Sequence, residues 1–451
     1  MSRRERSFVS RSAGTYASSL GVAVLSLVNV LLISRSLGPS GRGAFAFLTT
    51  VATITNYLST LGVQEANANI AAREPDRRRS LATNSVLLAL ALGVTSGAIV
   101  AGLIAALPGL GAHTDPGLRY LALAAIPVQI MQMYMWRLSQ ADYAFAVTNV
   151  TWLLPPVTQV VFNGAMAAAG ELTVGRALAA WVGGQALSLA ILLWYVGRRL
   201  AGFGRPSFPL ARRSLAFGLK SHAGGVMLLG NYRLDQWFVG ALAGTRELGL
   251  YSVAVGWAEG LFYLPTALSL VQRPDIVRAS PAEAVRRAGA ICRAALLLTV
   301  PLAGGLVLLA PFLCTTVFGE RFRGSIDDLR VLAPGAFGIV AIKLLGSALT
   351  AQRKPVLESV AIGVSFLVTV ALDIALIPDH GGLGAALAST IAYSVGGIAV
   401  AVIFARTLGG RPRDFVPRLD DVTGVARAFR RTLRRRPAIT AEEAPPLVAG
   451  E

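Results

Sequence analysis

The sequence has few charged residues. Only 15% of its 451 residues are Asp, Glu, Lys or Arg, whereas 54% are hydrophobic, and the mean hydropathy is +0.59. A soluble protein has about a quarter of its residues charged. This shortage of charge excludes an ordinary soluble fold and predicts an all-α polytopic membrane protein.

Cysteine and histidine are also scarce. Cys292 and Cys314 lie near opposite ends of one apolar segment. A helix rises about 1.5 Å per residue, so their separation is too long for a disulfide. We therefore interpret both as small buried apolar residues. The three histidines share no spacing that fits a metal site, and we expect neither a metal nor a cofactor.

Acidic residues are outnumbered by basic ones, and the net charge is +18. A strongly basic chain can bind nucleic acid, but here the arginines lie between apolar segments and not on one soluble face. We therefore expect no nucleic acid partner. The basic N-terminus, "MSRRERSFVSR", precedes an apolar run over 14–34. That run is long enough to cross a bilayer, so we interpret it as a transmembrane helix and not as a cleaved signal peptide.

A transmembrane helix needs about 20 mostly apolar residues, and the sequence offers twelve such segments. The expected spans are 14–36, 43–66, 82–107, 118–138, 146–168, 174–196, 215–243, 248–270, 288–312, 330–350, 356–377 and 381–405.

Basic residues predict the orientation of these spans. If the N-terminus is cytoplasmic, the cytoplasmic segments hold 29 Lys and Arg residues and the outer loops and helix ends hold 8. We therefore expect both termini in the cytoplasm. The expected organisation is a tail over 1–13, an N-lobe over 14–197, a cytoplasmic linker over 198–214, a C-lobe over 215–405 and a basic, largely disordered tail over 406–451.

The C-terminal tail has two interpretations. The stretch "VTGVARAFRRTLRRR" fits a basic amphipathic helix on the membrane surface. It fits equally well a solvated tail that enforces the topology.

The two halves of the chain contain a weak internal repeat. When "NVLLISRSLGPSGRGAFAF" is set against "DQWFVGALAGTRELGLYSV", 206 residues later, Gly38 aligns with Gly244, and Gly43 aligns with Gly249. Pro127 aligns with Pro334 at an offset of 207. The offset is close to half of a twelve-span chain. It predicts two pseudo-symmetric six-helix lobes with parallel topology, an architecture of transporters.

Four stretches resemble a known family. They are "ISRSLGPSGRGAFAF", "FGLKSHAGGVMLLGNYRLDQWFVGALAGTRELGLYSVAVGWAEGLFYLP", "FGERFRGSIDDLRVLAPGAF" and "LTAQRKP". In these stretches, which are spread over most of the chain, the sequence resembles the oligosaccharide (O-antigen and polysaccharide type) flippases of the multidrug/oligosaccharidyl-lipid/polysaccharide exporter superfamily.

The resemblance implies two six-helix lobes in a V and transport by alternating access. It implies a cargo, an undecaprenyl-diphosphate-linked oligosaccharide moved to the outer leaflet for lipopolysaccharide or other surface polysaccharide. The implied location is the bacterial cytoplasmic membrane. The expected partners are this lipid-linked oligosaccharide, membrane lipids, a coupling ion (H+ or Na+) and polysaccharide assembly proteins.

Other functions remain as alternatives. Peptidoglycan-precursor flippases usually have fourteen spans, and drug exporters of the superfamily usually have an acidic residue within the first lobe. Here the first span offers Asn29, whereas Glu65 and Asp142 lie near cytoplasmic helix ends. A membrane enzyme acting on lipid-linked glycans is the third alternative. The sequence has no Asp-x-Asp motif, no long loop and no His/Glu cluster to support it.

The seventh span contains "NYRLDQWFVG", which places Arg233 and Asp235 deep in an apolar segment. An ionised side chain in hydrocarbon costs between about 2.5 and about 17 kcal/mol, so these residues need a partner or a water-filled cavity. By helical spacing, Lys220 and Asn231 share the face of Asp235. A cleft lined by Lys220, Arg233 and Lys343 would fit a lipid diphosphate, because guanidinium groups match phosphate geometry.

Further candidates complete the expected cleft. Glu259, at the centre of the eighth span, is expected to pair with Arg233 or to titrate during transport. Neutral groups expected to meet sugar hydroxyls are Asn29, Gln132, Asn163 and Asn231. Arg137 is a weaker candidate near a cytoplasmic helix end.

Each candidate also has a structural interpretation. Arg233 would then pair with Asp235 or Glu259 only to hold spans together. Lys343, Arg137 and Arg293 would reach the cytoplasmic interface. Asp373 is expected at the outer interface.

Overall fold

The computed structural model describes residues 3–111, 114–200, 202–418 and 421. Within these ranges every regular element is a helix and none is a strand, which confirms the all-α prediction. The first half contains α1 (Arg3–Ser59), α2 (Val63–Arg73), α3 (Arg78–Ala106), α4 (Pro116–Ala124), α5 (Ile126–Ala141), α6 (Phe145–Ala168) and α7 (Val174–Tyr195), with the short helices η1 (Pro75–Arg77), η2 (Pro108–Gly111) and η3 (Val196–Leu200).

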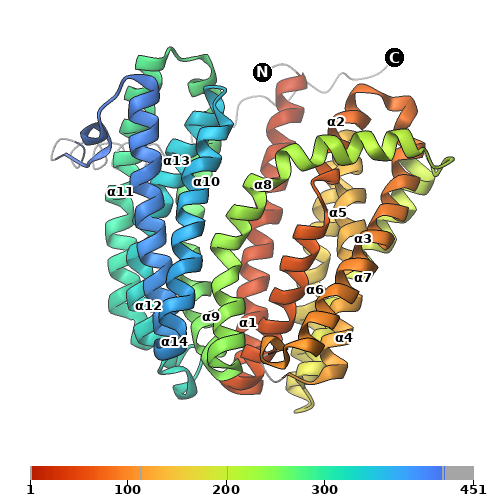
Figure 1. The fold of residues 1–451 in the computed structure, drawn as a ribbon, viewed down its shortest axis with the longest axis horizontal. Helices are drawn as coiled ribbons and strands as arrows, with labels where there is room; N and C mark the ends of the chain where they lie inside the picture. The colour runs from red at the N-terminus through yellow and green to blue at the C-terminus, as the bar shows by residue number, and fades with distance from the viewer. Residues whose placement is uncertain (1–2, 112–113, 201, 419–420, 422–451) are drawn as a thin grey trace, which may run out of the picture.

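The second half repeats this pattern of long helices and short connections. It contains α8 (Phe208–Phe238), η4 (Val239–Ala243), α9 (Thr245–Gly260), α10 (Tyr263–Arg278), α11 (Pro281–Pro311), η5 (Phe312–Thr316), η6 (Glu320–Phe322), α12 (Ser325–Leu332), η7 (Ala333–Gly335), α13 (Ala336–Ala351), α14 (Pro355–Leu408) and η8 (Pro412–Phe415). Figure 1 shows α3–α7 on one side and α10–α14 on the other, with α1, α8 and α9 between them.

The twelve expected spans are largely helical, but the chain leaves the helix at 60–62, inside the expected span 43–66, and at 261–262, inside the expected span 248–270. Eight helices of the described chain are long and apolar enough to cross a membrane. Two of these, Ser18–Ser59 and Pro355–Leu408, each contain two expected spans, because the backbone leaves the helical conformation at Gly38 and at Gly381. The expected span 118–138 corresponds to two helices, α4 and α5, with a break between them. The expected span 215–243 corresponds to most of α8 together with η4.

The internal repeat is visible in the backbone. Gly38 has φ 67° and ψ −174°, and Gly244 has φ 91° and ψ 172°, so both hairpins turn through the same conformation. This region of φ and ψ is essentially restricted to glycine. Pro127 stands at the start of α5, where the fourth span breaks, and Pro334 lies in η7, where the tenth span breaks. The chain is thus two lobes with matching kinks.

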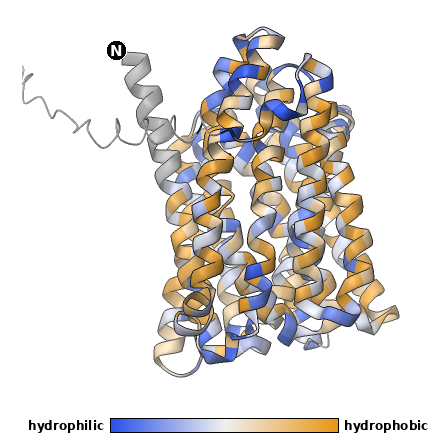
Figure 2. Ribbon diagram, turned by 90° about the vertical axis from the view of Figure 1, so that its left-hand side faces the viewer, coloured by the Kyte–Doolittle hydropathy of each residue, from blue (hydrophilic) through white to orange (hydrophobic). Residues whose placement is uncertain are grey.

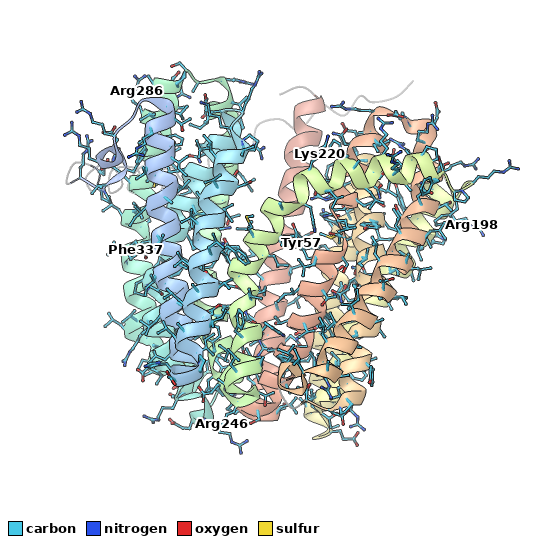
Figure 3. All side chains as sticks on the ribbon, viewed as in Figure 1. Tyr57, Arg198, Lys220, Arg246, Arg286 and Phe337 are labelled. Atoms are coloured by element: carbon cyan, nitrogen blue, oxygen red, sulfur yellow. The ribbon has the colours of Figure 1, made fainter. Side chains whose placement is uncertain are left out.

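The two ends of the molecule differ in charge. We define the hairpin end as the end that holds the turns at Gly38, Gly244 and Gly381, and the basic end as the opposite one. Figure 3 shows Arg198 and Arg286 at the basic end and Arg246 at the hairpin end. Between the ends the helices are predominantly hydrophobic (Figure 2), and large apolar side chains such as Leu308 are exposed, as a lipid-facing belt requires.

Helix α8 begins seven residues before the expected seventh span. Its first part runs along the basic end over the N-lobe before the helix turns into the bundle (Figure 1). Asn84 holds its start, accepting a hydrogen bond from the backbone N–H of Ser207 at 3.0 Å and donating to the Ser207 carbonyl at 2.9 Å. Arg213 forms an ion pair with Glu74 at 2.7 Å and lowers the pKa of that carboxyl. The linker therefore ends in a helix that is attached to the N-lobe.

Candidate functional site

A cavity of about 630 Å³ lies between the two lobes. Its walls come from α1, α6 and α7 of the N-lobe and from α8, α9 and the start of α10 of the C-lobe, with Phe318 from the segment after η5. Its charged lining residues are Arg42, Arg233 and Glu259. Two cations face one anion, so the described lining carries a surplus positive charge and favours an anionic ligand.

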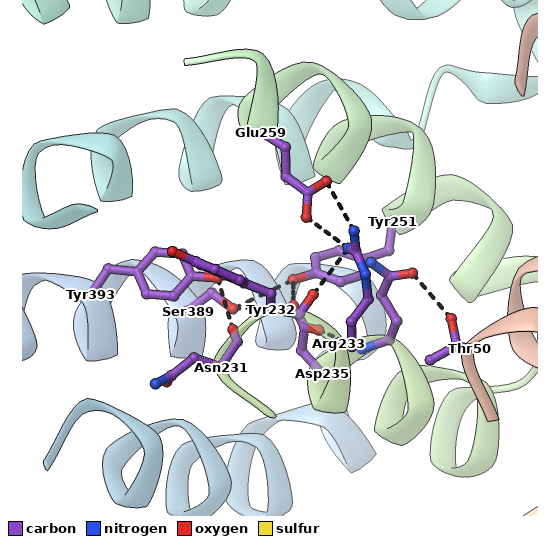
Figure 4. Close-up of polar contacts among 10 residues, drawn as sticks. Thr50, Asn231, Tyr232, Arg233, Asp235, Tyr251, Glu259, Ser389 and Tyr393 are labelled. Atoms are coloured by element: carbon purple, nitrogen blue, oxygen red, sulfur yellow. Dashed lines mark hydrogen bonds and ion pairs between the residues drawn. The ribbon is translucent and has the colours of Figure 1, made fainter. Parts of the chain in front are cut away.

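Arg233 and Glu259 form the ion pair that the sequence predicts as one of two alternatives. Arg233 Nη1 lies 2.6 Å from Glu259 Oε1, and Nη2 lies 3.3 Å from Oε2 (Figure 4). This two-pronged geometry is the strong form of a guanidinium–carboxylate contact. About a third of each side chain remains exposed, so both groups reach the cavity while they are paired.

Arg42 is the cavity residue that sequence reasoning missed. It lies in the part of α1 that follows the Gly38 turn, it is 9% exposed, and its Nε has no hydrogen-bond partner. No carboxylate of the described residues lies within ion-pair distance of it, and its guanidinium lies close enough to Arg233 to repel it. A buried cation without a counter-ion is costly, and a bound anion would remove that cost.

Asn29 lies in the cavity wall with two amide neighbours. Its Nδ2 donates to Gln159 Oε1 at 3.0 Å, and its Oδ1 accepts from Asn163 Nδ2 at 2.7 Å. Asn29 and Gln159 both line the cavity. Across the cavity, Thr50 of the N-lobe contacts Gln236 of the C-lobe at 3.5 Å. These neutral groups give the cavity donors and acceptors beside its charges.

Asn231 and Asp235 face the interior of the C-lobe, away from the cavity lining. Asn231 donates to the carbonyl of Ile362 at 3.2 Å, and its Oδ1 accepts from Thr369 at 3.0 Å. Asp235 accepts from the Tyr251 hydroxyl at 2.5 Å (Figure 4). Both residues are less than 5% exposed. They attach α8 to α14 and α9, on the face of α8 opposite to the cavity.

Asp373 corrects one expectation. The sequence places it at the outer interface, but the structure buries it completely inside the C-lobe, and neither carboxylate oxygen has a hydrogen-bond partner. Its charge lies near that of Asp235. The described residues contain no group of three or more His, Cys, Asp or Glu side chains that would hold a metal ion. A buried carboxylate without a cationic contact, such as that of Asp373, can be accommodated by binding a proton or a monovalent cation.

The remaining candidates lie apart from the cavity lining. Lys220 is exposed on the part of α8 nearest the basic end (Figure 3). Lys343 Nζ lies over the ring of Tyr232, 5.6 Å from its centroid. Gln132 donates to Ser188 at 2.8 Å inside the N-lobe. Arg137 forms an ion pair with Glu65 at 2.7 Å. The structure therefore brings together Arg233, Glu259 and Asn29 from the predicted set.

Sequence comparison assigns the chain to a family. The family model described as "Polysaccharide biosynthesis protein" matches residues 32–327, which include α8, α9 and the whole cationic part of the cavity. The chain belongs to the polysaccharide biosynthesis protein family. A search of curated proteins gave no match.

Solved structures confirm the fold of this polysaccharide biosynthesis protein. It is similar to a lipid II flippase, MurJ, in an inward closed conformation, with 14% identity, a TM-score of 0.74 and coverage of 94% of this chain and 93% of that one. It is also similar to an inward-facing multidrug resistance MATE family transporter of the MOP superfamily, with 14% identity, a TM-score of 0.67 and coverage of 86% and 94%. A MOP superfamily transporter from Pyrococcus furiosus shares 14% identity at a TM-score of 0.56, with coverage of 89% and 95%. The two-lobed fold is therefore that of MOP superfamily transporters.

Proposed function

We propose that this protein is an alternating-access transporter that flips a polyprenyl-diphosphate-linked oligosaccharide from the cytoplasmic to the outer leaflet for surface polysaccharide synthesis. The observation that carries the proposal is the unpaired Arg42 beside Arg233 in a cavity between two lobes. A diphosphate carries compact negative charge and accepts hydrogen bonds from guanidinium forks. It would supply the counter-ion that Arg42 lacks.

The rest of the cavity supports the same ligand. Asn29, Gln159 and Gln236 offer neutral hydrogen-bonding groups for sugar hydroxyls. On α1, Val24 and Leu27 line the cavity and are also 54% and 40% exposed. That apolar stripe gives a prenyl tail a path between the cavity and the surrounding lipid while the headgroup stays among the arginines.

The distribution of basic residues supports an orientation. The basic end would face the cytoplasm and the hairpin end the outer side, because cytoplasmic segments retain Lys and Arg. Both chain termini would then be cytoplasmic, in the bacterial cytoplasmic membrane. Polysaccharide assembly proteins remain expected partners.

A coupling ion has its own candidate site. Asp235 and Asp373 are both buried inside the C-lobe, close enough for their charges to interact, and Asp235 also accepts a hydrogen bond from the hydroxyl of Ser389. Because Asp235 adjoins Arg233 on α8 and Asp373 lies on α14, binding of H+ or Na+ at this pair would change the packing of α8 against the lobe. Ion binding would thereby be linked to the cavity.

The test uses purified protein in liposomes that contain a fluorescent polyprenyl-diphosphate-linked oligosaccharide. The proposal predicts protein-dependent movement of this lipid between leaflets. Movement of a cationic drug instead would favour the drug-exporter alternative, and movement of a peptidoglycan precursor alone would favour the precursor-flippase alternative. Chemical modification of the glycan would favour a membrane enzyme.

A further inference from the structure

Two glycines bring the backbones of the lobes into direct contact at the hairpin end. Gly43 on α1 lies so close to Thr245 at the start of α9 that an added methyl group would overlap the Thr245 carbonyl oxygen. Gly249 on α9 lies equally close to Pro39 on α1, and a methyl group there would overlap the Pro39 carbonyl oxygen. Small residues allow helix backbones to approach in this way. We call this contact the glycine crossing.

The glycine crossing is reciprocal. Thr245 lies 206 residues after Pro39, and Gly249 lies 206 residues after Gly43, which is the offset of the internal repeat. Each lobe therefore places its repeat-related glycine against the corresponding position of the other lobe. Such a self-complementary contact is the signature of an isologous, two-fold interface. The pseudo-two-fold relation between the lobes passes through this crossing.

The crossing lies next to the cavity on the side of the hairpin end. The cavity is lined on α1 by Phe45 and Ala46, two and three residues after Gly43, and on α9 by Ser252 and Val253, three and four residues after Gly249. Apart from α8, the lobes contact each other mainly through α1, which packs against α9, η4 and η6. The short helix η2 also packs against η4. Figure 1 shows α1 and α9 reaching the hairpin end, and η4 ends directly before the turn at Gly244. The cavity is therefore closed toward that end by the crossing.

Weak bonds surround this backbone contact. Among the described residues no backbone hydrogen bond joins Gly43 or Gly249 to the opposite lobe. Beside the crossing, Arg35 of α1 donates to the carbonyls of Val317 and Thr316 at 2.8 and 2.9 Å, at the C-terminal end of η5, where a cation is favoured by the helix dipole. Among the described residues, parting the hairpins here breaks no backbone ladder, and the side-chain hydrogen bonds lost beside the crossing are those of Arg35.

We infer that the glycine crossing is the gate at the hairpin end: it seals the cavity while Gly43 and Gly249 are in contact and opens when they part. The inference rests on the proposed transport function, but its test does not require transport. A side chain at either glycine fits only when the hairpins are apart. Gly43→Ala and Gly249→Ala are therefore both expected to shift the protein toward a state that is open at the hairpin end.

The test measures access to the cavity. Thr49→Cys, half-buried in the cavity wall, serves as the reporter in a chain in which the buried Cys292 and Cys314 are replaced by Ala. A membrane-impermeant thiol reagent is applied from the side of the hairpin end. We expect Gly43→Ala and Gly249→Ala each to raise the labelling rate by at least about tenfold, which corresponds to about 1.4 kcal/mol.

Gly256→Ala is the matched control. It lies on the same helix as Gly249 and lines the same cavity, and nothing lies within 4 Å of an added methyl group, so labelling is expected to stay unchanged. Arg35→Gln, which removes only the clamp, is expected to raise labelling even if a glycine variant fails to accumulate. If the labelling rate is unchanged in Arg35→Gln and in every glycine variant that reaches a normal protein level, the proposal that the glycine crossing is a gate is wrong. Increased labelling in a protein that flips no lipid would retain the gate and reject the proposed cargo.

Discussion

At the scale of single residues, the two cavity arginines differ in their partners. Arg233 has Glu259 as a counter-ion, whereas Arg42 has none among the described residues. A residue that is fully paired can serve packing alone, but an unpaired guanidinium in a cavity wall has no structural benefit to offset its desolvation. Replacing Arg42 therefore tests ligand binding directly. Replacing Arg233 tests whether its ion pair with Glu259 can be separated from ligand binding.

The Arg233–Glu259 pair gives the first prediction. Arg233→Gln leaves Glu259 without its partner, and removing one member of a buried pair costs about 3–5 kcal/mol, less where the pair is partly exposed, as here. The double variant Arg233→Gln with Glu259→Gln is expected to restore protein level and thermal stability but not lipid flipping. The double variant Arg233→Gln with Asp235→Asn is not expected to restore stability, because Asp235 accepts a hydrogen bond from the Tyr251 hydroxyl and is not the counter-ion of Arg233. Recovery of flipping in either double variant would make the arginine a packing residue only.

The buried carboxylates give the second prediction. Asp373→Asn is expected to abolish the dependence of transport on the coupling ion while the protein still folds, because the asparagine keeps the shape of the side chain and removes its charge. Transport is measured in liposomes with and without a Na+ or proton gradient. Asp379→Asn, an exposed change on the same helix, serves as the control. An unchanged gradient dependence in Asp373→Asn would place ion coupling elsewhere.

At the scale of elements, hydropathy and glycine spacing predicted the spans, the hairpins and the repeat, because these depend on local chain properties. The positions of Arg42 and Asp373 were not predictable in this way. Arg42 follows "GPSG", which is typical of a loop, yet the helix resumes directly after Gly38 with Pro39 in its first turn. Asp373 lies near an end of its span, and hydropathy reports depth along a helix but not which neighbour its side chain faces.

The third prediction concerns the glycine turns. Gly38 and Gly381 have φ values of 67° and 54° with extended or negative ψ, a conformation that costs other residues on the order of 1–3 kcal/mol. Gly38→Ala and Gly381→Ala are expected to lower the melting temperature of the purified protein in detergent. Gly256→Ala lies within a helix and meets no neighbour, so it should leave that temperature unchanged or raise it slightly. Equal melting temperatures for all three variants would mean that the turns carry no such strain.

At the scale of the whole molecule, the two lobes meet at the hairpin end, around the cavity that holds Arg42 and Arg233, and again where α8 lies against the N-lobe. The repeat supplies the symmetry, and α8 breaks it by running over the N-lobe before it enters the C-lobe. The orientation proposed for this assembly in the membrane rests on the unequal charge of its two ends. The fold was predictable to the level of two lobes, whereas the cavity required the packing of α1 against α9.

The orientation gives the fourth prediction. A cysteine at Arg246, which is exposed at the hairpin end, should react with an impermeant thiol reagent in intact cells. Cysteines at Arg205 and Arg278, both exposed at the basic end, should react only after permeabilisation. Reaction of the Arg205 or Arg278 cysteine in intact cells would reverse the proposed orientation.

The rate of lipid flipping by the Arg42→Gln protein tests the central claim most directly. It is measured in liposomes with the fluorescent polyprenyl-diphosphate-linked oligosaccharide, beside Arg246→Gln as an exposed arginine outside the cavity. Because Arg42 has no protein counter-ion to leave stranded, its replacement should not destabilise the fold. The account predicts that Arg42→Gln keeps its melting temperature and loses at least about 90% of the flipping rate, a tenfold change that corresponds to about 1.4 kcal/mol, while Arg246→Gln flips normally. A folded Arg42→Gln protein that flips the lipid at the unmodified rate would contradict the cationic cavity as the path of the headgroup.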